Sequence, residues 1–138
     1  MVRVLRDHET VKLPERKSTT AAAFDIYVPE TTTVEPDSVT MIPHGVKVEI
    51  PRGYFGLIKE RSSLAARGLH VVAGVIDSDY RGEIMVLLRN TTSEEYIAEK
   101  DDRVAQLILI PQYRHSAVEV EELTSTDRGA GGFGSTGQ

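Results

Sequence analysis

An aspartate at the end of a short apolar run is the side chain best placed for acid–base chemistry in this sequence. The apolar residues of Gly74–Ile76 lead into Asp77, and a polar turn then runs on to Gly82. A carboxylate at a strand end beside a hairpin can take a proton from water and so act as a general base. Aspartate is also a common turn residue, and an isolated Asp-Ser-Asp would favour that structural role. The whole string favours chemistry, because Tyr80 is large and a turn does not need it.

The C-terminal tail carries a second set of groups that could contact a ligand. Five of the eleven glycines of the chain lie between Gly129 and Gly137, which by itself is typical of a disordered linker. The same tail holds Arg128 for charge and Phe133 for stacking on an aromatic ring. Glycine amides and the hydroxyls of Ser135 and Thr136 could contact phosphate oxygens. Together these groups suit a phosphorylated aromatic ligand.

Three further segments offer polar groups among apolar neighbours. Ser62 or Ser63, after Arg61, could cap a short helix over 64–67 that Gly68 ends, or the three residues could cradle a phosphate; the residues leave both roles open. Asp25 could help to hold hydrated Mg²⁺ or shape a turn. Gln106 interrupts an aliphatic run, where it is either an outward-facing strand residue or a donor to a phosphate. The four histidines lack ligand spacing, so we assign them no chemistry.

Composition limits the class of protein that must position these groups. The 138 residues are 40% hydrophobic and 27% charged, which fits one soluble globular domain spanning 1–138. The net charge of −5 argues against general nucleic-acid binding, and no apolar run is long enough to span a membrane. The N-terminus lacks the apolar core of a signal peptide, so secretion is not expected. The absence of cysteine excludes disulfides and a cysteine nucleophile.

Short strands between turn residues dominate the pattern and predict an all-β fold. Pro and Gly separate the candidates, with Pro43 among the separating residues. Many short strands at this spacing indicate a β-sandwich or jelly roll, with one short helix and a mobile Gly-rich arm over 127–138. The candidate strands are Val46–Ile50, Tyr54–Ile58, Ile84–Leu88, Val104–Ile110 and Ala117–Val120.

Taken in order, these segments resemble the five motifs of the trimeric dUTP pyrophosphatase (dUTPase) family, nearly end to end. A Gly-rich tail alone is weak support, but five ordered motifs in a chain of this length are strong support. The matching segments are Ala22–Tyr27, Arg61–Ala65, Gly74–Gly82, Asp102–Leu107 and Arg128–Gly137.

The resemblance implies a jelly-roll homotrimer with active sites shared between subunits. The implied reaction is hydrolysis of dUTP to dUMP and pyrophosphate with Mg²⁺, which limits uracil incorporation into DNA and supplies dUMP for dTMP synthesis. The implied location is the cytoplasm, or the nucleus or host cell for a eukaryotic or viral source. No nucleic-acid or membrane partner is implied.

The resemblance also assigns roles by matching position. Asp77 would activate the attacking water, Asp25 would lie near the metal and its waters, and Tyr80 would pack on the deoxyribose and exclude a 2′-hydroxyl. Backbone groups near Val72 to Gly74 would contact the uracil edge, Phe133 would stack on the base, and Arg128 would act on the β- and γ-phosphates. The remaining substrate-binding residues would be Arg61, Ser62, Ser63, Val75, Ile76, Gln106, Gly134, Ser135 and Thr136.

Four residues depart from the usual motifs: Ala23, Glu60, Ser63 and Asp102. None removes a proposed catalytic group, and Glu60 could pair with Arg61 or weaken phosphate affinity.

Two other functions remain possible on the same fold. A dCTP deaminase would need a glutamate base in the strand after the hairpin, where Leu87 stands and cannot move a proton. A regulatory protein switched by a bound nucleotide is the other alternative.

Overall fold

The computed structural model describes residues 1–132, which form ten β-strands and one short helix. The elements are β1 (Arg3–Arg6), β2 (Ala23–Tyr27), β3 (Thr32–Val34), β4 (Val39–Glu49), β5 (Tyr54–Glu60), α1 (Ser62–Ala65), β6 (Leu69–Val72), β7 (Val75–Ile76), β8 (Glu83–Asn90), β9 (Tyr96–Ala98) and β10 (Arg103–Pro111).

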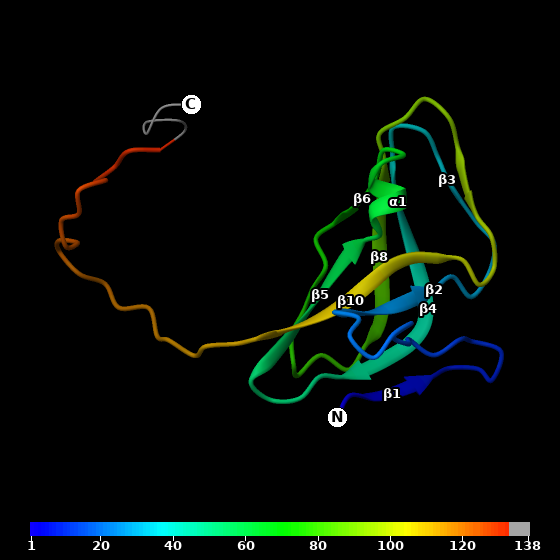
Figure 1. Cartoon of the computed structure of the whole chain (residues 1–138), viewed down its shortest axis with the longest axis horizontal. Coiled ribbons are helices and arrows are strands. Elements are labelled where there is room, and N and C mark those ends of the chain that lie inside the picture. Colours follow the sequence, from blue (N-terminus) through cyan, green and yellow to red (C-terminus); the bar gives the residue numbers. More distant parts are fainter. Residues whose placement is uncertain (133–138) are drawn as a thin grey trace.

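Two four-stranded antiparallel sheets and a small two-stranded sheet make up the body of the molecule (Figure 1). The strand order is β1-β4-β8-β6 in one sheet and β2-β10-β5-β7 in the other, while β3 pairs with β9. Alternate residues of each central strand are buried, such as Ile84, Val86 and Leu88 of β8. This alternation places one face of each sheet on a shared apolar core. The expected all-β sandwich is confirmed.

Pro43 lies inside a strand and does not end one, contrary to the sequence prediction. Strand β4 runs through it for eleven residues, and its register with β8 shifts between Pro43 and Lys47. Proline cannot donate to the ladder, so it is tolerated at such a bulge. Gly45 follows with φ of +64°, and a Cβ there would lie 2.9 Å from a methyl of Val11. Only glycine meets both conditions without strain.

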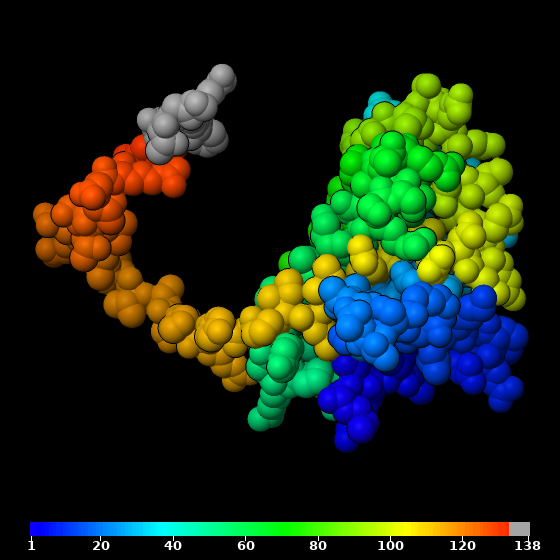
Figure 2. Space-filling view, in the orientation of Figure 1, coloured from blue at the N-terminus to red at the C-terminus, as the bar shows by residue number. Residues whose placement is uncertain are grey.

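The predicted strand at Ala117–Val120 is wrong for the single chain. The chain leaves the body after β10, and we call the segment from residue 112 onward the arm; its described part, 112–132, contains no strand (Figure 1). Val118 and Val120 are 78% and 57% exposed. Their alternation has the right period, but a strand also needs a backbone partner, and the arm curves away from the body (Figure 2).

The helix begins two residues earlier than predicted, at Ser62. Arg61, with extended backbone angles, is the N-cap residue, and neither Ser62 nor Ser63 caps with its side chain. Strand β5 continues to Glu60, so the chain turns into the helix directly after it and both serines fall in the first turn. The helix also ends earlier than predicted, at Ala65, and hydrogen-bonded turns continue from there to Gly68, which has φ of +79°. Within residues 1–132, no helix is long and apolar enough to cross a membrane.

Candidate active site

Asp77 follows directly on a strand, as the sequence predicts. The two residues of β7 pair with Gly56 and Leu57 of β5, which fixes where the strand ends. The amide of Tyr80 donates to the carbonyl of Asp77 at 3.1 Å and closes a turn. The Asp77 side chain is exposed at this turn, where water can reach it. These backbone contacts fix the position of Asp77 in the chain, and its carboxylate is open to solvent.

The same turn holds Tyr80 by two contacts. Its hydroxyl donates to the carbonyl of Glu83 at 3.0 Å. Its ring folds over Gly82, where an added Cβ would lie 2.3 Å from the phenol oxygen. Tyr80 remains 41% exposed, so part of its side chain is open to solvent in the turn that follows Asp77.

The segment that precedes Asp77 is fixed to β5. Gly74 has φ of +102°, and a Cβ there would lie 2.7 Å from the carbonyl oxygen of Ile58. The carbonyl of Gly74 accepts a hydrogen bond of 2.8 Å from the amide of Ile58. This close approach of two backbones requires glycine and sets the path of the chain from Val72 into β7.

Glu60 supports this segment and does not pair with Arg61. Its carboxylate accepts a hydrogen bond of 3.1 Å from the amide of Val71 and lies 3.3 Å from the ammonium of Lys59. Burial raises the pKa of Glu60, but hydrogen bonds from its own amide, Val71 and Lys59 outweigh burial and lower the pKa overall. Glu60, one of the four residues that depart from the usual motifs, therefore holds β6 against β5.

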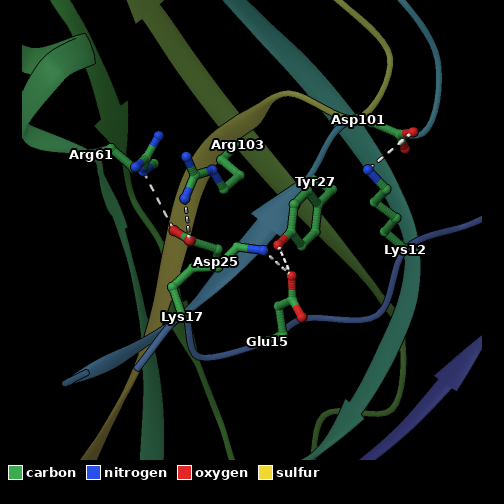
Figure 3. A network of polar contacts seen from close by, with 8 residues as sticks. All are labelled: Lys12, Glu15, Lys17, Asp25, Tyr27, Arg61, Asp101 and Arg103. Atoms are coloured by element: carbon green, nitrogen blue, oxygen red, sulfur yellow. Dashed lines mark hydrogen bonds and ion pairs between the residues drawn. The ribbon is translucent and has the colours of Figure 1, made fainter. Parts of the chain in front are cut away.

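Asp25 lies between two arginines and is in a strand, not a turn. One carboxylate oxygen is 3.4 Å from Nε of Arg61 and the other is 3.1 Å from Nη1 of Arg103 (Figure 3). The three residues come from β2, the N-cap of α1 and the start of β10. Sequence reasoning assigned no role to Arg103, although it lies in the fourth motif. The ion pairs join three elements that are far apart in the chain.

A second polar network ties the N-terminal loop to β2 beside Asp25. The hydroxyl of Tyr27 donates to Glu15 at 2.5 Å, and Lys17 also bonds to Glu15 (Figure 3). Burial, followed by the hydrogen bond to Glu15, raises the pKa of Tyr27. The backbones of Glu15 and Asp25 exchange hydrogen bonds of 3.3 and 2.8 Å. Lys12 lies 5.4 Å from the centre of the Tyr27 ring, so several cations gather around this strand.

Gln106 is brought to the same place by strand register. It lies opposite Asp25 on β2 and opposite Lys59 on β5. Its side-chain nitrogen donates to the carbonyl of Glu60 at 3.0 Å. An amide nitrogen carries two hydrogens, so a second donor remains for a ligand. Both roles left open by the sequence are compatible with this position.

Within residues 1–132 of one chain, the candidate residues form two separate groups. Asp77 lines a groove of about 900 Å³ together with Asp79, Arg81 and arm residues 112–115. Arg61, Ser63 and Arg103 line a different pocket of about 440 Å³ between α1 and the turn before β10.

The groups expected from the tail are described only in part. Arg128 lies in the described part of the arm, where its Nε donates to the carbonyl of Gly131 at 2.9 Å. The other tail residues predicted to bind substrate, Phe133, Gly134, Ser135 and Thr136, lie outside the described residues.

An all-β sandwich with a carboxylate at a strand end and arginines gathered around a second carboxylate has the groups needed to bind phosphates and activate water. These features are compatible with a β-sandwich enzyme that acts on a phosphorylated substrate. The model of the dUTPase family matches residues 9–137, and the chain belongs to this family.

Curated relatives from distant sources agree with this assignment. The deoxyuridine 5'-triphosphate nucleotidohydrolase of Paramecium bursaria Chlorella virus 1 is 45% identical over 130 residues, covering 94% of this chain and 92% of the relative. The protein of the same name from Nautilia profundicola is 40% identical over 140 residues, covering 99% of both chains.

Solved structures share the fold. The Staphylococcus bacteriophage 80alpha dUTPase with dUPNHPP has a TM-score of 0.92 and 30% identity, covering 100% of this chain and 99% of that one. It is described as controlling transfer of virulence genes by a G protein-like mechanism. A mutant dUTPase from phage phi11, with a TM-score of 0.81 and 28% identity, covers 88% of this chain and 97% of its own. That structure is described as revealing coordination of a structural Mg(II) ion.

Proposed function

We propose that the protein hydrolyses dUTP to dUMP and pyrophosphate. The observation that carries this proposal is the exposed Asp77 carboxylate, fixed at the end of β7 in a chain of the dUTPase family. The activity in the names of the relatives, deoxyuridine 5'-triphosphate nucleotidohydrolase, supports the same substrate. In a cell this reaction would limit uracil incorporation into DNA and supply dUMP for dTMP synthesis.

In the proposed reaction Asp77 takes a proton from a water molecule as the water oxygen bonds to the α-phosphorus. The bond between that phosphorus and the oxygen bridging to the β-phosphate breaks, and pyrophosphate leaves with the bond electrons. The proton taken by Asp77 is then lost to solvent. The chemistry depends mainly on positioning and on neutralising charge, which suits a site built from arginines and a single base.

The residues present fit a hydrated Mg²⁺ that binds the protein through water molecules and not through direct side-chain ligands. Residues 1–132 contain no group of three or more acidic or histidine side chains able to enclose a metal. Mg²⁺ commonly keeps several waters and binds through few carboxylates and substrate phosphates. When bound, it would neutralise charge on the phosphates. Asp25 would accept hydrogen bonds from its waters, because each oxygen holds one arginine and has a lone pair to spare.

We assign substrate recognition to the residues around these two carboxylates. The ring of Tyr80 would occupy the space of a 2′-hydroxyl, and the backbone from Val72 to Gly74 would bind the uracil edge. Arg61, Ser62, Ser63 and Gln106 would contact the phosphates, while Val75 and Ile76 would line the nucleoside side. The arm would close over the nucleotide with Phe133 on the base and Arg128, Gly134, Ser135 and Thr136 around the phosphates.

We further propose that the active form is a homotrimer with sites shared between subunits. Asp77 and Arg61 line different cavities of one chain, so a site that needs both groups can be completed by a neighbour. The outer face of the β1-β4-β8-β6 sheet also carries apolar side chains. Met41 of β4 is 60% exposed and lies opposite Leu87 of β8. Val118 and Val120 of the arm are exposed and have no strand partner within residues 1–132 of their own chain. A neighbouring subunit would supply such a partner.

An assay of phosphate release with added inorganic pyrophosphatase tests the activity. The protein with Mg²⁺ is offered dUTP, dCTP, dTTP and UTP in separate reactions, and ammonia is measured in parallel. We expect phosphate from dUTP alone at an appreciable rate. Ammonia from dCTP would instead establish a deaminase, and nucleotide binding without any product would favour the regulatory alternative.

A further inference from the structure

Strand β6 lies at the edge of its sheet, and one side chain of the other sheet supplies a contact that a neighbouring strand would otherwise give. Within residues 1–132, β8 pairs with β6 on one side and no strand pairs with it on the other. Val71 lies opposite Leu88 of β8, and its amide donates to the carboxylate of Glu60, which belongs to the other sheet. A backbone amide at a sheet edge needs an acceptor, and here that acceptor is a single side chain.

The residues that follow Val71 form a bend with costly backbone angles. Ala73 has φ of +64° and Gly74 has φ of +102°, so two consecutive residues are in the left-handed region. This conformation costs free energy at alanine in particular and persists only where surrounding contacts hold it. The Gly74 end is held by its backbone hydrogen bond to Ile58, and the Val71 end is held by Glu60. Alternate residues of β5 therefore anchor both ends of the bend over 72–74.

Glu60 is itself held in place. Its side chain is 15% exposed, and its carboxylate lies 3.3 Å from the ammonium of Lys59. Its backbone lies opposite Ala105 of β10, and its carbonyl accepts the hydrogen bond from Gln106. The carboxylate that holds Val71 is thus attached to a well-paired central strand and can fix the bend relative to β5.

We propose that Glu60 is a positioning residue for base recognition, because its carboxylate holds the backbone of residues 72–74 where that backbone can contact the edge of uracil. The inference rests on the proposed function, which places uracil at this segment. Hydrogen bonds to a base edge discriminate between bases only when their donors and acceptors are held in place. A looser bend would therefore bind uracil less tightly and distinguish it less well from cytosine.

The catalytic step should not depend on this contact. Asp77 is positioned by the pairing of β7 with Gly56 and Leu57 of β5, which does not involve Glu60. Loss of the Glu60 carboxylate should thus affect binding of the base and leave activation of the water intact.

Titration calorimetry of the full chain with dUMP, dCMP and inorganic pyrophosphate tests the proposal. Glu60→Ala should weaken dUMP binding by about tenfold, because the bend loses one of its two anchors. Binding of dCMP, and of pyrophosphate with Mg²⁺, should change little, because neither ligand presents a uracil edge. The KM for dUTP should rise with little change in kcat, because the base is bound alike in the ground and transition states.

Two conservative variants separate the hydrogen bond from the charge. Glu60→Gln keeps a carbonyl acceptor at the same reach, so it should keep most of the dUMP affinity. Glu60→Asp keeps the charge beside Lys59, but its shorter side chain falls short of the Val71 amide, so it should behave like Glu60→Ala. Glu35→Ala, at an exposed position before β4, should leave all three affinities unchanged. Hydrogen exchange of the Val71 amide, measured by NMR, should be faster in the Ala and Asp variants than in the Gln variant.

Thermal melting shows whether each variant folds, and Glu60→Asp replaces Glu60→Ala in the comparison if the alanine variant does not. Unchanged dUMP affinity in the folded variants would overturn the proposal. Equal losses for dUMP, dCMP and pyrophosphate would also overturn it, since they indicate a general disturbance. A loss in Glu60→Gln as large as in Glu60→Ala would assign the effect to charge and not to the hydrogen bond. Failure of the proposed function is distinct, because it would appear as a parent protein that does not hydrolyse dUTP, whatever the variants do.

Discussion

At the residue scale, Asp77 is held by its backbone, so its side chain can be changed without disturbing the fold. Asp77→Asn should keep the melting temperature and nucleotide binding while kcat for dUTP falls on the order of 10²–10⁴-fold, as for loss of a general base. Steady-state rates with Mg²⁺, compared with the melting curve, check this. A rate within a few-fold of the parent would remove Asp77 from the role.

Tyr80 allows a separate test of sugar specificity. Tyr80→Val removes the ring from the turn that follows Asp77 and should raise kcat/KM for UTP relative to dUTP by about tenfold or more. Tyr80→Phe is the control, since it keeps the ring and loses only the hydrogen bond to Glu83. The steric role fails if the two variants give the same UTP to dUTP ratio as the parent.

His44 makes stability depend on acidity. Burial lowers its pKa from 6.5 to about 4, and its Nδ1 lies 2.7 Å from the carbonyl of Tyr27. Its Nε2 is buried with no partner among residues 1–132. The unfolded chain takes up the proton near pH 6.5 but the folded chain only near pH 4. Above pH 6.5 His44 is neutral in both states and does not lower the free energy of unfolding. As the pH falls from 6.5 toward 4, the free energy of unfolding decreases by roughly 3 kcal/mol, because only the unfolded chain takes up the proton.

Urea unfolding of the parent and His44→Gln between pH 4 and pH 7 measures this effect. The free energy of unfolding should fall more steeply with acid in the parent, because the variant lacks the titrating ring. Parallel curves for the two proteins would show that His44 does not contribute.

At the element scale, the turn from β6 to β7 depends on one glycine. Gly74→Ala should lower the free energy of unfolding, since it adds a Cβ against the Ile58 carbonyl at a positive φ. Gly53→Ala is the matched control, with φ of +85° and nothing within 4 Å of its added Cβ. Gly74→Ala should cost at least about 1 kcal/mol more than the control by overpacking. If urea unfolding shows the same decrease in the free energy of unfolding for Gly74→Ala and Gly53→Ala, the contact with the Ile58 carbonyl contributes nothing beyond backbone strain.

Much of the sheet structure could be predicted from the sequence because it depends on local alternation. Strands β5, β8 and β10 contain their predicted segments, and Asp77 lies at the strand end expected for it. Local patterns could not distinguish a strand from an unpaired extended segment at Ala117–Val120, because pairing is set by distant residues. For the same reason the sequence predicts a break between strands at Pro43, although β8 supplies a bulged partner there.

The candidate site divides in the same way. Motif positions predicted Asp25, Arg61 and Gln106, which the structure brings together. The arginine pair around Asp25 and the Glu15 network were not predicted, because they join segments through tertiary contacts. The roles of the tail residues stay predictions.

At the scale of the whole molecule, the shared sites that we propose predict complementation between two defective proteins. Asp77→Asn and a chain ending at Asp127 should each be nearly inactive alone. When they are refolded together, some mixed trimers would combine an intact Asp77 with an intact tail, and activity should follow the fraction of mixed trimers. Mass measurement gives that fraction. Mixed trimers as inactive as either parent would contradict the shared site.

Because the arm is exposed, a protease should abolish the activity of the protein sooner than it destroys the folded body. Arg114 and Arg128 lie in the extended segment after β10, whereas the sandwich strands are protected by pairing and burial. An arginine-specific protease would therefore cut the arm first and leave a body whose core is intact. Such a clipped protein would keep its spectroscopic signature and lose the groups that we propose close over the nucleotide. Proteolysis of the arm would thus abolish enzymatic activity while the core of the protein is still folded.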